Sequence, residues 1–319
     1  MSNTILDVKN LKKYFKVKNG MLHAVDDVSF SVNEGETIGV VGESGCGKST
    51  LGRTVLHLLD NDGGQLIYRG EDITKINNKK LRNLRQKMQI IFQDPYSSLD
   101  PRMSISAAIA EPLKLKGGLK KSEIERRTEE LMETVGLASR LYYSYPHELD
   151  GGRRQRVVIA RALALNPEFI VCDEPVSALD VSIQAQVLNL MQDLQEEKKL
   201  TYMFITHNLS VVKYISNTII VMYLGQVVER ASSEELFNHP YHPYTKALLS
   251  AIPLPDPHVE PNRILLEGEL TSPINPKPGC RFAARCAYAT DMCKKNQSLV
   301  EISKEHFVSC CRVNEINNL

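Results

Sequence analysis

One glycine-rich stretch constrains the fold of this chain more than any other feature. A β-branched run from Thr37 to Val41 ends at Gly42, and the residues from Lys48 to Leu59 follow a helix-like pattern. The stretch that joins them reads GESGCGKST, which fits G-x-x-x-x-G-K-[ST] in the strand, turn and helix context that this pattern requires. The sequence therefore predicts a phosphate-binding turn between a strand and a helix.

Each residue type in this turn has a physical role. Glycines allow backbone N–H groups to curl around phosphate oxygens, Lys48 supplies a cation to the β- and γ-phosphates, and the Ser49 hydroxyl can bind Mg²⁺. We expect nucleotide contacts from Gly42, Glu43, Ser44, Gly45, Cys46, Gly47, Lys48, Ser49 and Thr50.

Polar side chains follow three further apolar runs. The run from Phe169 to Cys172 is followed by Asp173 and Glu174. Asp173 is the candidate for holding Mg²⁺, and Glu174 is the candidate general base, because a water that attacks the γ-phosphate must be oriented and lose a proton. Gln93 and His207 each follow another apolar run, from which they can reach the metal, the water or the γ-phosphate.

The order of the expected elements indicates an α/β fold. Strand-like runs, including residues 202–206 and 218–222, alternate with helix-compatible stretches such as residues 183–197. Such alternation is typical of an α/β domain with a largely parallel sheet. Between about residues 104 and 165 the strand pattern gives way to helical periodicity, which predicts a helical subdomain inserted into the sheet domain.

Composition and charge disfavour several classes of protein. The 39 Lys and Arg residues balance 38 Asp and Glu residues, and 42% of the chain is hydrophobic. These values disfavour a disordered chain, a collagen-like chain and a basic nucleic-acid-binding chain, so we expect no nucleic-acid partner. The amino terminus lacks a secretory signal, and no apolar run approaches the roughly 18 to 20 residues that span a bilayer. We therefore expect a cytosolic chain that reaches a membrane only through a partner.

Six motifs occur in a fixed order between Leu6 and Arg230. They are GESGCGKST, Gln93, LDGGRRQR at residues 149–156, Asp173-Glu174, Ser177-Ala178-Leu179-Asp180 and His207. In this order they resemble the Walker A, Q-loop, signature, Walker B, D-loop and switch-histidine motifs of the nucleotide-binding subunit of an ATP-binding cassette (ABC) transporter. The resemblance implies a P-loop NTPase cassette over residues 1–235, with a RecA-like core, an antiparallel β subdomain and an α-helical subdomain.

The same resemblance implies how ATP and Mg²⁺ are held. Phe15, or its neighbour Tyr14, matches the position at which the family stacks an aromatic ring on adenine. Gln93 joins Ser49 and Asp173 at the Mg²⁺ ion. Two cassettes pair head to tail, so that the signature motif of one cassette, here Asp150, Gly151 and Gly152, completes the ATP site of the other.

The signature motif departs from the family pattern. The usual sequence is LSGGQ, whereas Asp150 stands here in place of the serine and Arg153 in place of the glutamine. A carboxylate 4 Å from a phosphate charge is repelled by about 4 kcal/mol at an effective dielectric constant near 20. Arg153 can neutralise this charge, Asp150 can turn away, or the composite site can bind ATP and hydrolyse it slowly. The asymmetry favours a heterodimer with a second ATPase that has an intact signature motif.

Beyond residue 235 the composition changes. Nine of the fifteen prolines fall between Pro240 and Pro278, and five of the seven cysteines fall in the last 40 residues. The stretch FNHPYHPYTKALLSAIP at residues 237–253 resembles the extension of the oligopeptide importer family, and QDPYSSLDPRM at residues 93–103 resembles the F-type subunit of its paired ATPases. We therefore expect a small cysteine-containing C-terminal extension over residues 236–319.

The clustered cysteines are candidate metal ligands. Cys280, Cys286 and Cys293 are followed by Cys310 and Cys311, and either of the last two can be the fourth ligand. Four thiolates can hold an iron–sulfur cluster or Zn²⁺, although the spacing is wider than in the tightest zinc sites. Free thiols and a disulfide are the remaining alternatives. Resemblance to peptide importers favours a four-iron (4Fe-4S) cluster.

Together these features predict an ATPase that powers the import of dipeptides or oligopeptides. The resemblance implies a place on the cytoplasmic face of the membrane, two transmembrane permeases, a second D-type ATPase and an extracytoplasmic binding protein as an indirect partner. A nickel or glutathione importer is an alternative, as is a subunit that mainly binds ATP and regulates its partner. A soluble ABC ATPase of DNA repair or translation fits less well, because this chain has one cassette and near-zero net charge.

Overall fold

The structure is a computed structural model that describes residues 3–253, 263–266, 268 and 272–318. The chain divides into two compact units, which we call the first and second units. The first contains Met1–Lys75 and Phe204–Leu319, and the second contains Ile76–Met203. Strand β8 (Thr201–Ile205) contains the point at which the chain passes from the second unit to the first.

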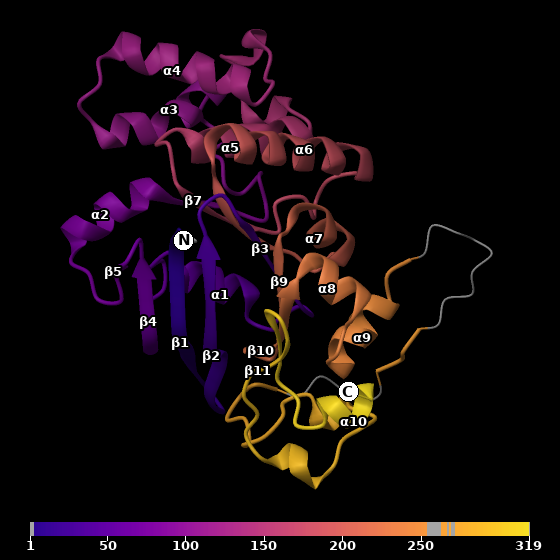
Figure 1. Ribbon diagram of the computed structural model, residues 1–319. Coiled ribbons are helices and arrows are strands. Elements are labelled where there is room, and N and C mark those ends of the chain that lie inside the picture. The colour runs from indigo at the N-terminus through magenta and orange to yellow at the C-terminus, as the bar shows by residue number, and fades with distance from the viewer. Residues whose placement is uncertain (1–2, 254–262, 267, 269–271, 319) are drawn as a thin grey trace. The chain divides into compact units, whose positions relative to one another are not determined.

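An antiparallel sheet forms the beginning of the first unit (Figure 1). Its strand order is β2-β1-β4-β5. Buried and exposed residues alternate in parts of β1, as in a sheet with one covered face, and Leu6 and Val8 are buried there. The strands are β1 (Thr4–Val17), β2 (Gly20–Asn33), β4 (Gly63–Tyr68) and β5 (Glu71–Asp72).

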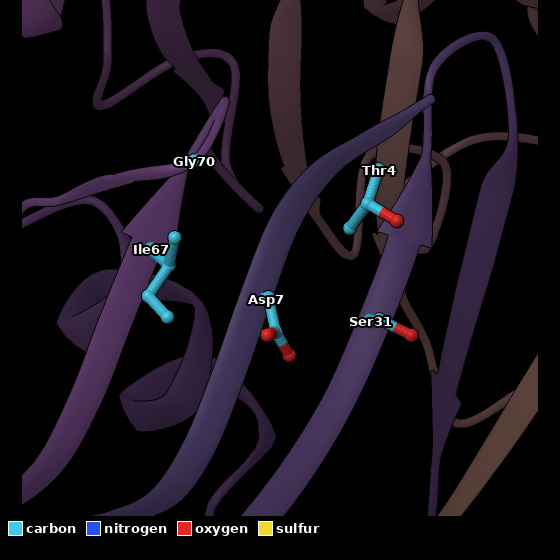
Figure 2. Close-up of a pocket in the computed structure, with 5 residues that line it drawn as sticks. All are labelled: Thr4, Asp7, Ser31, Ile67 and Gly70. Carbon is cyan, nitrogen blue, oxygen red and sulfur yellow. The ribbon is translucent and has the colours of Figure 1, made fainter. Parts of the chain in front are cut away.

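A hollow of about 350 Å³ lies on this sheet (Figure 2). Asp7 of β1 stands in register between Ser31 of β2 and Ile67 of β4, and Thr4 and Gly70 complete the lining. None of these five residues belongs to the predicted nucleotide site, so the hollow plays no part in it.

A second set of strands in the first unit has the order β3-β9-β10-β12-β11. β3 and β9 are parallel, whereas the other neighbours are antiparallel. Every residue of β3 is buried, as expected for a strand that is covered on both faces. The strands are β3 (Thr37–Val41), β9 (Thr218–Tyr223), β10 (Gln226–Ser232), β11 (Val300–Ser303) and β12 (His306–Val308).

The helices of the first unit are short. They are α1 (Lys48–Val55), α7 (Leu209–Ile215), α8 (Ser233–Asn238), α9 (Pro243–Ser250) and α10 (Val313–Asn317), with 3₁₀ turns at Ala283–Arg285 and Asp291–Lys294. The sequence predicts that the first of these helices continues to Leu59. It ends earlier because His57 has a φ of 52°, a left-handed conformation that cannot continue a right-handed helix.

The described residues beyond 235 belong to the first unit and pack against it. β12 extends the sheet by pairing with β10, and the buried His306 ring lies 2.8 Å from the buried carboxylate of Glu229. The same carboxylate accepts hydrogen bonds from the backbone N–H groups of Tyr241 and His242, so its polar oxygens are satisfied. Phe282, which is 1% exposed, packs in a hydrophobic cluster with residues of β9 and α9.

The second unit is mainly helical. Its parallel strands β6 and β7 pair in register, and α3, α4 and α6 each contact α5 (Figure 1). The elements are α2 (Asn78–Lys87), β6 (Met88–Ile91), α3 (Ile105–Lys116), α4 (Lys121–Thr134), α5 (Gly151–Leu163), β7 (Phe169–Asp173) and α6 (Val181–Lys198), with 3₁₀ turns at Ser139–Leu141 and Pro146–Glu148.

These elements confirm the predicted α/β class. Each of the four strands read from the sequence is present within one residue of its expected bounds, and helices fill the stretch from 104 to 165. Among the described residues, no helix is both long enough and apolar enough to cross a membrane.

Candidate nucleotide-binding site

The phosphate loop, residues 42–50, depends on two glycines for its shape. Gly42 has a φ of 149° and Gly47 a φ of 104°, conformations that L side chains rarely adopt. A Cβ atom on Gly42 would lie 2.2 Å from the carbonyl oxygen of Met222, and one on Gly47 would lie 2.0 Å from that of Ala24. The turn therefore needs glycine at both positions, for backbone conformation and for space.

Lys48 begins α1 and points back into this loop. Its side chain is buried, and its ammonium group donates to the carbonyl oxygens of Gly42 at 2.7 Å and Glu43 at 2.9 Å. The thiol of Cys46 lies 3.7 Å from the same nitrogen, and burial raises the pKa of this thiol. A cation held inside a loop of backbone N–H groups suits the phosphates of a nucleotide.

Two residues that the sequence did not indicate support the loop from outside. The backbone N–H of Glu43 donates to the hydroxyl of Tyr244 at 2.9 Å, and the guanidinium of Arg285 lies 2.8 Å from the Glu43 carboxylate. Both partners are more than 200 positions away along the chain. No local pattern marks such contacts, so only the folded chain reveals them.

The expected base-stacking position lies on β1. Tyr14 stacks on His23 with ring centroids 4.0 Å apart and donates a hydrogen bond to Asp26, whereas Phe15 is half-buried with Lys13 5.3 Å from its ring centroid. Burial and the hydrogen bond to Asp26 raise the pKa of Tyr14. Tyr14 is thus engaged in a local network, which makes Phe15 the better candidate for stacking on adenine.

Glu174 lies directly after the buried strand β7 in the second unit. Its carboxylate accepts a hydrogen bond of 2.9 Å from the side-chain amide of Gln93, which follows β6. Its φ is 49°, a left-handed conformation that costs a non-glycine residue about 1 to 2 kcal/mol. Such strain is found where the surrounding structure fixes a side chain for a task. The neighbouring Asp173 is 2% exposed, and the Ser177 hydroxyl donates to the Glu174 carbonyl oxygen.

Asp150 and Arg153 form a local pair at the start of α5. The Asp150 carboxylate caps this helix by accepting the Arg153 N–H at 2.8 Å, and it lies 3.5 Å from the Arg153 guanidinium. Gly151 and Gly152 form the first turn of the helix, and a Cβ atom on Gly152 would lie 2.5 Å from the Ile183 side chain. The carboxylate of Asp150, which departs from the family pattern, thus lies next to the guanidinium of Arg153, which can neutralise its charge.

The predicted site residues divide between the two units. Phe15, the phosphate loop and His207, which follows β8, lie in the first unit. Gln93, Asp150, Gly151, Gly152, Asp173 and Glu174 lie in the second. The hydroxyl of Ser49 and the carboxylate of Asp173 are hard oxygen donors of the kind that Mg²⁺ prefers.

The cysteines of the extension gather in one region as free thiols. Burial, followed by the charges of Cys293, Cys310 and Cys286, raises the pKa of Cys280 to about 11. The sulfur atom of Cys311 lies 4.0 Å from that of Cys293. Over the part of the chain that the structure describes, however, no three Cys, His, Asp or Glu side chains form a group that could hold a metal ion. The predicted iron–sulfur cluster therefore has no support in this geometry and stays a prediction.

Two family patterns match the chain. The family described as "ABC transporter" matches residues 25–177, which contain the phosphate loop, Gln93 and Glu174. The family described as "Oligopeptide/dipeptide transporter, C-terminal region" matches residues 228–293, which contain Tyr244 and Arg285.

Solved structures share the cassette fold. The dimeric ATP-binding cassette MJ0796, in a post-hydrolysis state bound to ADP and Pi, is 29% identical, with a TM-score of 0.66 over 72% of this chain and 99% of its own. The cbiO1 protein of Clostridium perfringens, part of the ABC transporter complex cbiONQ, is 26% identical, with a TM-score of 0.67 over 74% and 92% of the two chains. These matches confirm the predicted ABC cassette.

Curated relatives match nearly the whole chain. The oligopeptide transport ATP-binding protein AppF of Bacillus subtilis is 49% identical over 96% of this chain and 97% of its own. The oligopeptide transport ATP-binding protein OppF of Escherichia coli is 48% identical over 98% and 97% of the two chains. The chain is therefore an ABC-type ATPase and belongs to the family of oligopeptide transport ATP-binding proteins.

Proposed function

We propose that this chain hydrolyses ATP to power the import of dipeptides or oligopeptides through a membrane ABC transporter. The observation that carries the proposal is the similarity over nearly the full chain to AppF and OppF, both named as oligopeptide transport proteins. The match of residues 228–293 to the C-terminal region of oligopeptide and dipeptide transporters supports the same substrate class.

The phosphate loop binds the nucleotide in this proposal. Its N–H groups and the buried Lys48 ammonium bind the phosphates, and Phe15 stacks on the adenine. Ser49 and Asp173, together with Gln93, would hold Mg²⁺, which neutralises charge on the β- and γ-phosphates when it is bound.

Glu174 accepts a proton from the attacking water. The hydrogen bond from Gln93 fixes one oxygen of this carboxylate. Gln93 therefore orients the general base and can respond to the metal or the attacking water beside it. His207 contacts the γ-phosphate. In this proposal catalysis rests on the placement of these groups around the γ-phosphate and on electrostatic stabilisation of the transferred phosphoryl group.

A second, D-type ATPase completes the working unit. The Asp150-containing signature of this chain faces the ATP of the partner ATPase, while an intact partner signature faces the phosphate loop of this chain. Two transmembrane permeases hold both ATPases at the cytoplasmic face of the membrane, and an extracytoplasmic binding protein delivers the substrate. The segment after Gln93 is the proposed contact with the permeases.

The pairing of Asp150 with Arg153 bears on the alternative, regulatory function. A carboxylate that caps a helix and lies beside a guanidinium has part of its charge compensated. This arrangement favours a composite site that still hydrolyses ATP over a site that only binds it. Single-turnover hydrolysis, with the general-base glutamate of each ATPase replaced in turn, separates the two functions.

The four-iron cluster is a separate proposal, and it rests on the cysteine spacing and the family resemblance. Iron and sulfide analysis with an absorption spectrum of anaerobically purified protein tests it. The proposal predicts both elements in a ratio near that of a four-iron cluster, with loss of both in a Cys280→Ser variant. Freshly made protein that contains neither element would contradict it.

Uptake by cells tests the function itself. Cells whose chromosomal copy carries Lys48→Ala should lose uptake of labelled dipeptides or oligopeptides, whereas cells with Lys9→Ala, a surface lysine paired with Asp7, should retain it. Labelled nickel and glutathione are measured beside the peptides. Loss of nickel or glutathione uptake with peptide uptake intact would replace the proposed substrate by that alternative.

A further inference from the structure

Residues 280–286 of the extension, CRFAARC, contact both the hairpin of β1 and β2 and the phosphate loop. We call this segment the arginine segment, because Arg281 and Arg285 make the contacts. Between them, Phe282 is 1% exposed and packs against Tyr223 and Tyr244, with ring centroids 5.3 and 5.4 Å away. This buried ring fixes the position from which the two arginines extend.

Arg281 contacts the hairpin that carries the base-stacking position. Its guanidinium donates to the carboxylate of Asp26 and to the carbonyl oxygen of Leu224, and its side chain is 6% exposed. Asp26 also accepts the Tyr14 hydroxyl and lies 3.0 Å from the His23 ring. Arg281 thereby holds the segments of β1 and β2 beside Phe15.

Arg285 contacts the phosphate loop. Its guanidinium lies 2.8 Å from the carboxylate of Glu43, and the two side chains are only 10% and 23% exposed. The backbone of Glu43 is held as well, because its N–H donates to the Tyr244 hydroxyl. Glu43 is therefore fixed at both its main chain and its side chain by residues beyond position 235.

The charge of Glu43 gives the Arg285 contact a functional consequence. A carboxylate in the loop that receives a nucleotide repels phosphate groups, and the repulsion is strong where solvent is partly excluded. Arg285 compensates this charge and draws the carboxylate toward the extension. Without Arg285, the phosphates would meet an unpaired anion.

The contact is not needed to attach the extension. β12 pairs with β10, His306 lies against the buried Glu229, and Phe282 is buried in the core. These interactions hold the extension independently of the Arg285 ion pair. Removing Arg285 should therefore change nucleotide affinity more than the folding of the chain.

We propose that Arg285 and Tyr244 are positioning residues of the phosphate loop, with Arg281 doing the same for the base-stacking hairpin, so that the C-terminal extension forms part of the ATP site. The inference rests on the proposed nucleotide site and deepens it. It assigns the extension a role in ATP binding through contacts of Arg281, Arg285 and Tyr244.

Titration of the full-length chain with a fluorescent ATP analogue and Mg²⁺ tests the proposal. Arg285→Gln should raise Kd about tenfold, a change within the range of coupling between contacting residues. Arg285→Lys keeps the charge and should bind nearly as wild type. The combination of Glu43→Gln with Arg285→Gln removes both charges and should recover most of the lost affinity, a rescue that a purely structural role does not predict.

Two further variants locate any failure. Arg312→Gln removes an extension arginine that pairs with Glu315, and it should leave Kd unchanged. Lys48→Ala should abolish binding. If wild type and Lys48→Ala bind equally poorly, the nucleotide site itself is wrong. If wild type binds but Arg285→Gln binds equally well, or if the double variant shows no recovery, only the role of the extension is overturned. Should Arg285→Gln not fold, the Arg285→Lys and double variants decide.

Discussion

The side-chain amide of Gln93 donates a hydrogen bond of 2.9 Å to the carboxylate of Glu174. The two residues follow neighbouring parallel strands, β6 and β7, whose register brings their carboxyl ends together. Glu174 holds a left-handed backbone conformation in this arrangement. This hydrogen bond therefore links Gln93, which we expect to contact the metal or the water, to Glu174, which we expect to activate the water.

Replacement of Gln93 by alanine should lower the turnover of ATP by about tenfold, because the carboxylate of Glu174 loses the donor that orients it. The steady-state hydrolysis rate of the assembled transporter measures the effect. Gln89→Ala is the matched control, since this amide lies on β6 and bonds to the backbone of Arg85. Equal rates for the two variants would show that the Gln93 contact has no catalytic role.

Asp150→Ser should fold as stably as wild type, because serine can also cap α5, whereas Asp150→Ala should lose about 1 kcal/mol of unfolding free energy. Urea unfolding of the isolated chain measures both values. If the alanine variant were as stable as wild type, the cap would add nothing to the free energy of unfolding. The presence of Asp150 would then have to be explained by its role at the ATP site shared with the partner ATPase.

Gly47→Ala should destabilise the chain by at least about 2 kcal/mol and abolish ATP binding, because its Cβ would lie 2.0 Å from a backbone oxygen. Gly35→Ala is the control: its φ of 75° is also positive, but no atom lies within 4 Å of the added Cβ. This control should cost only about 1 kcal/mol. Unfolding midpoints and ATP titrations measure both variants. If the two variants do not differ in stability or in ATP binding, the loop does not need glycine at position 47.

His242 should make the stability of the chain depend on pH. Burial lowers its pKa to about 4, although the charge of Glu229 acts in the opposite direction. The unfolded side chain titrates near pH 6.5, so between about pH 6.5 and 4 the unfolded chain binds a proton that the folded chain does not. The contribution of neutral His242 to the free energy of unfolding is therefore complete above about pH 6.5. It decreases as the pH falls, and about 2 kcal/mol is lost at pH 5.

The variant His242→Asn tests this pH dependence. Asparagine keeps an acceptor for the Tyr244 N–H at the start of α9 but does not titrate. Urea unfolding at pH 7 and pH 5 should show a smaller loss for this variant than for wild type. The exposed His147→Asn should lose as much as wild type. An identical pH dependence of wild type and His242→Asn would remove His242 as its source.

Local patterns in the sequence predicted much of the fold. The run Thr37 to Val41, the glycine-rich loop and Lys48 predicted a strand, a turn and a helix, because hydrophobic period and glycine spacing are local properties. The sequence pattern predicts too late an end for α1, because the residue type does not reveal the left-handed conformation of His57.

Contacts between distant parts of the chain could not be predicted in this way. Nothing near Glu43 indicates that Tyr244 and Arg285 support it, and nothing near Gln93 indicates its hydrogen bond to Glu174. Such contacts depend on how the elements pack. The cysteines show the converse limit. Their spacing leaves several ligand types open and the family resemblance favours a four-iron cluster, but the described side chains form no group that could hold a metal ion.

ATP turnover by the assembled transporter with Glu174→Gln tests the central claim most directly, with ATP binding measured on the same preparation. Glu168→Gln, a carboxylate just before β7 that pairs with Lys87, is the control. The account predicts that Glu174→Gln binds ATP and loses turnover by at least about 100-fold, while the control keeps wild-type turnover. Hydrolysis preserved in Glu174→Gln would contradict the assignment of Glu174 as the general base.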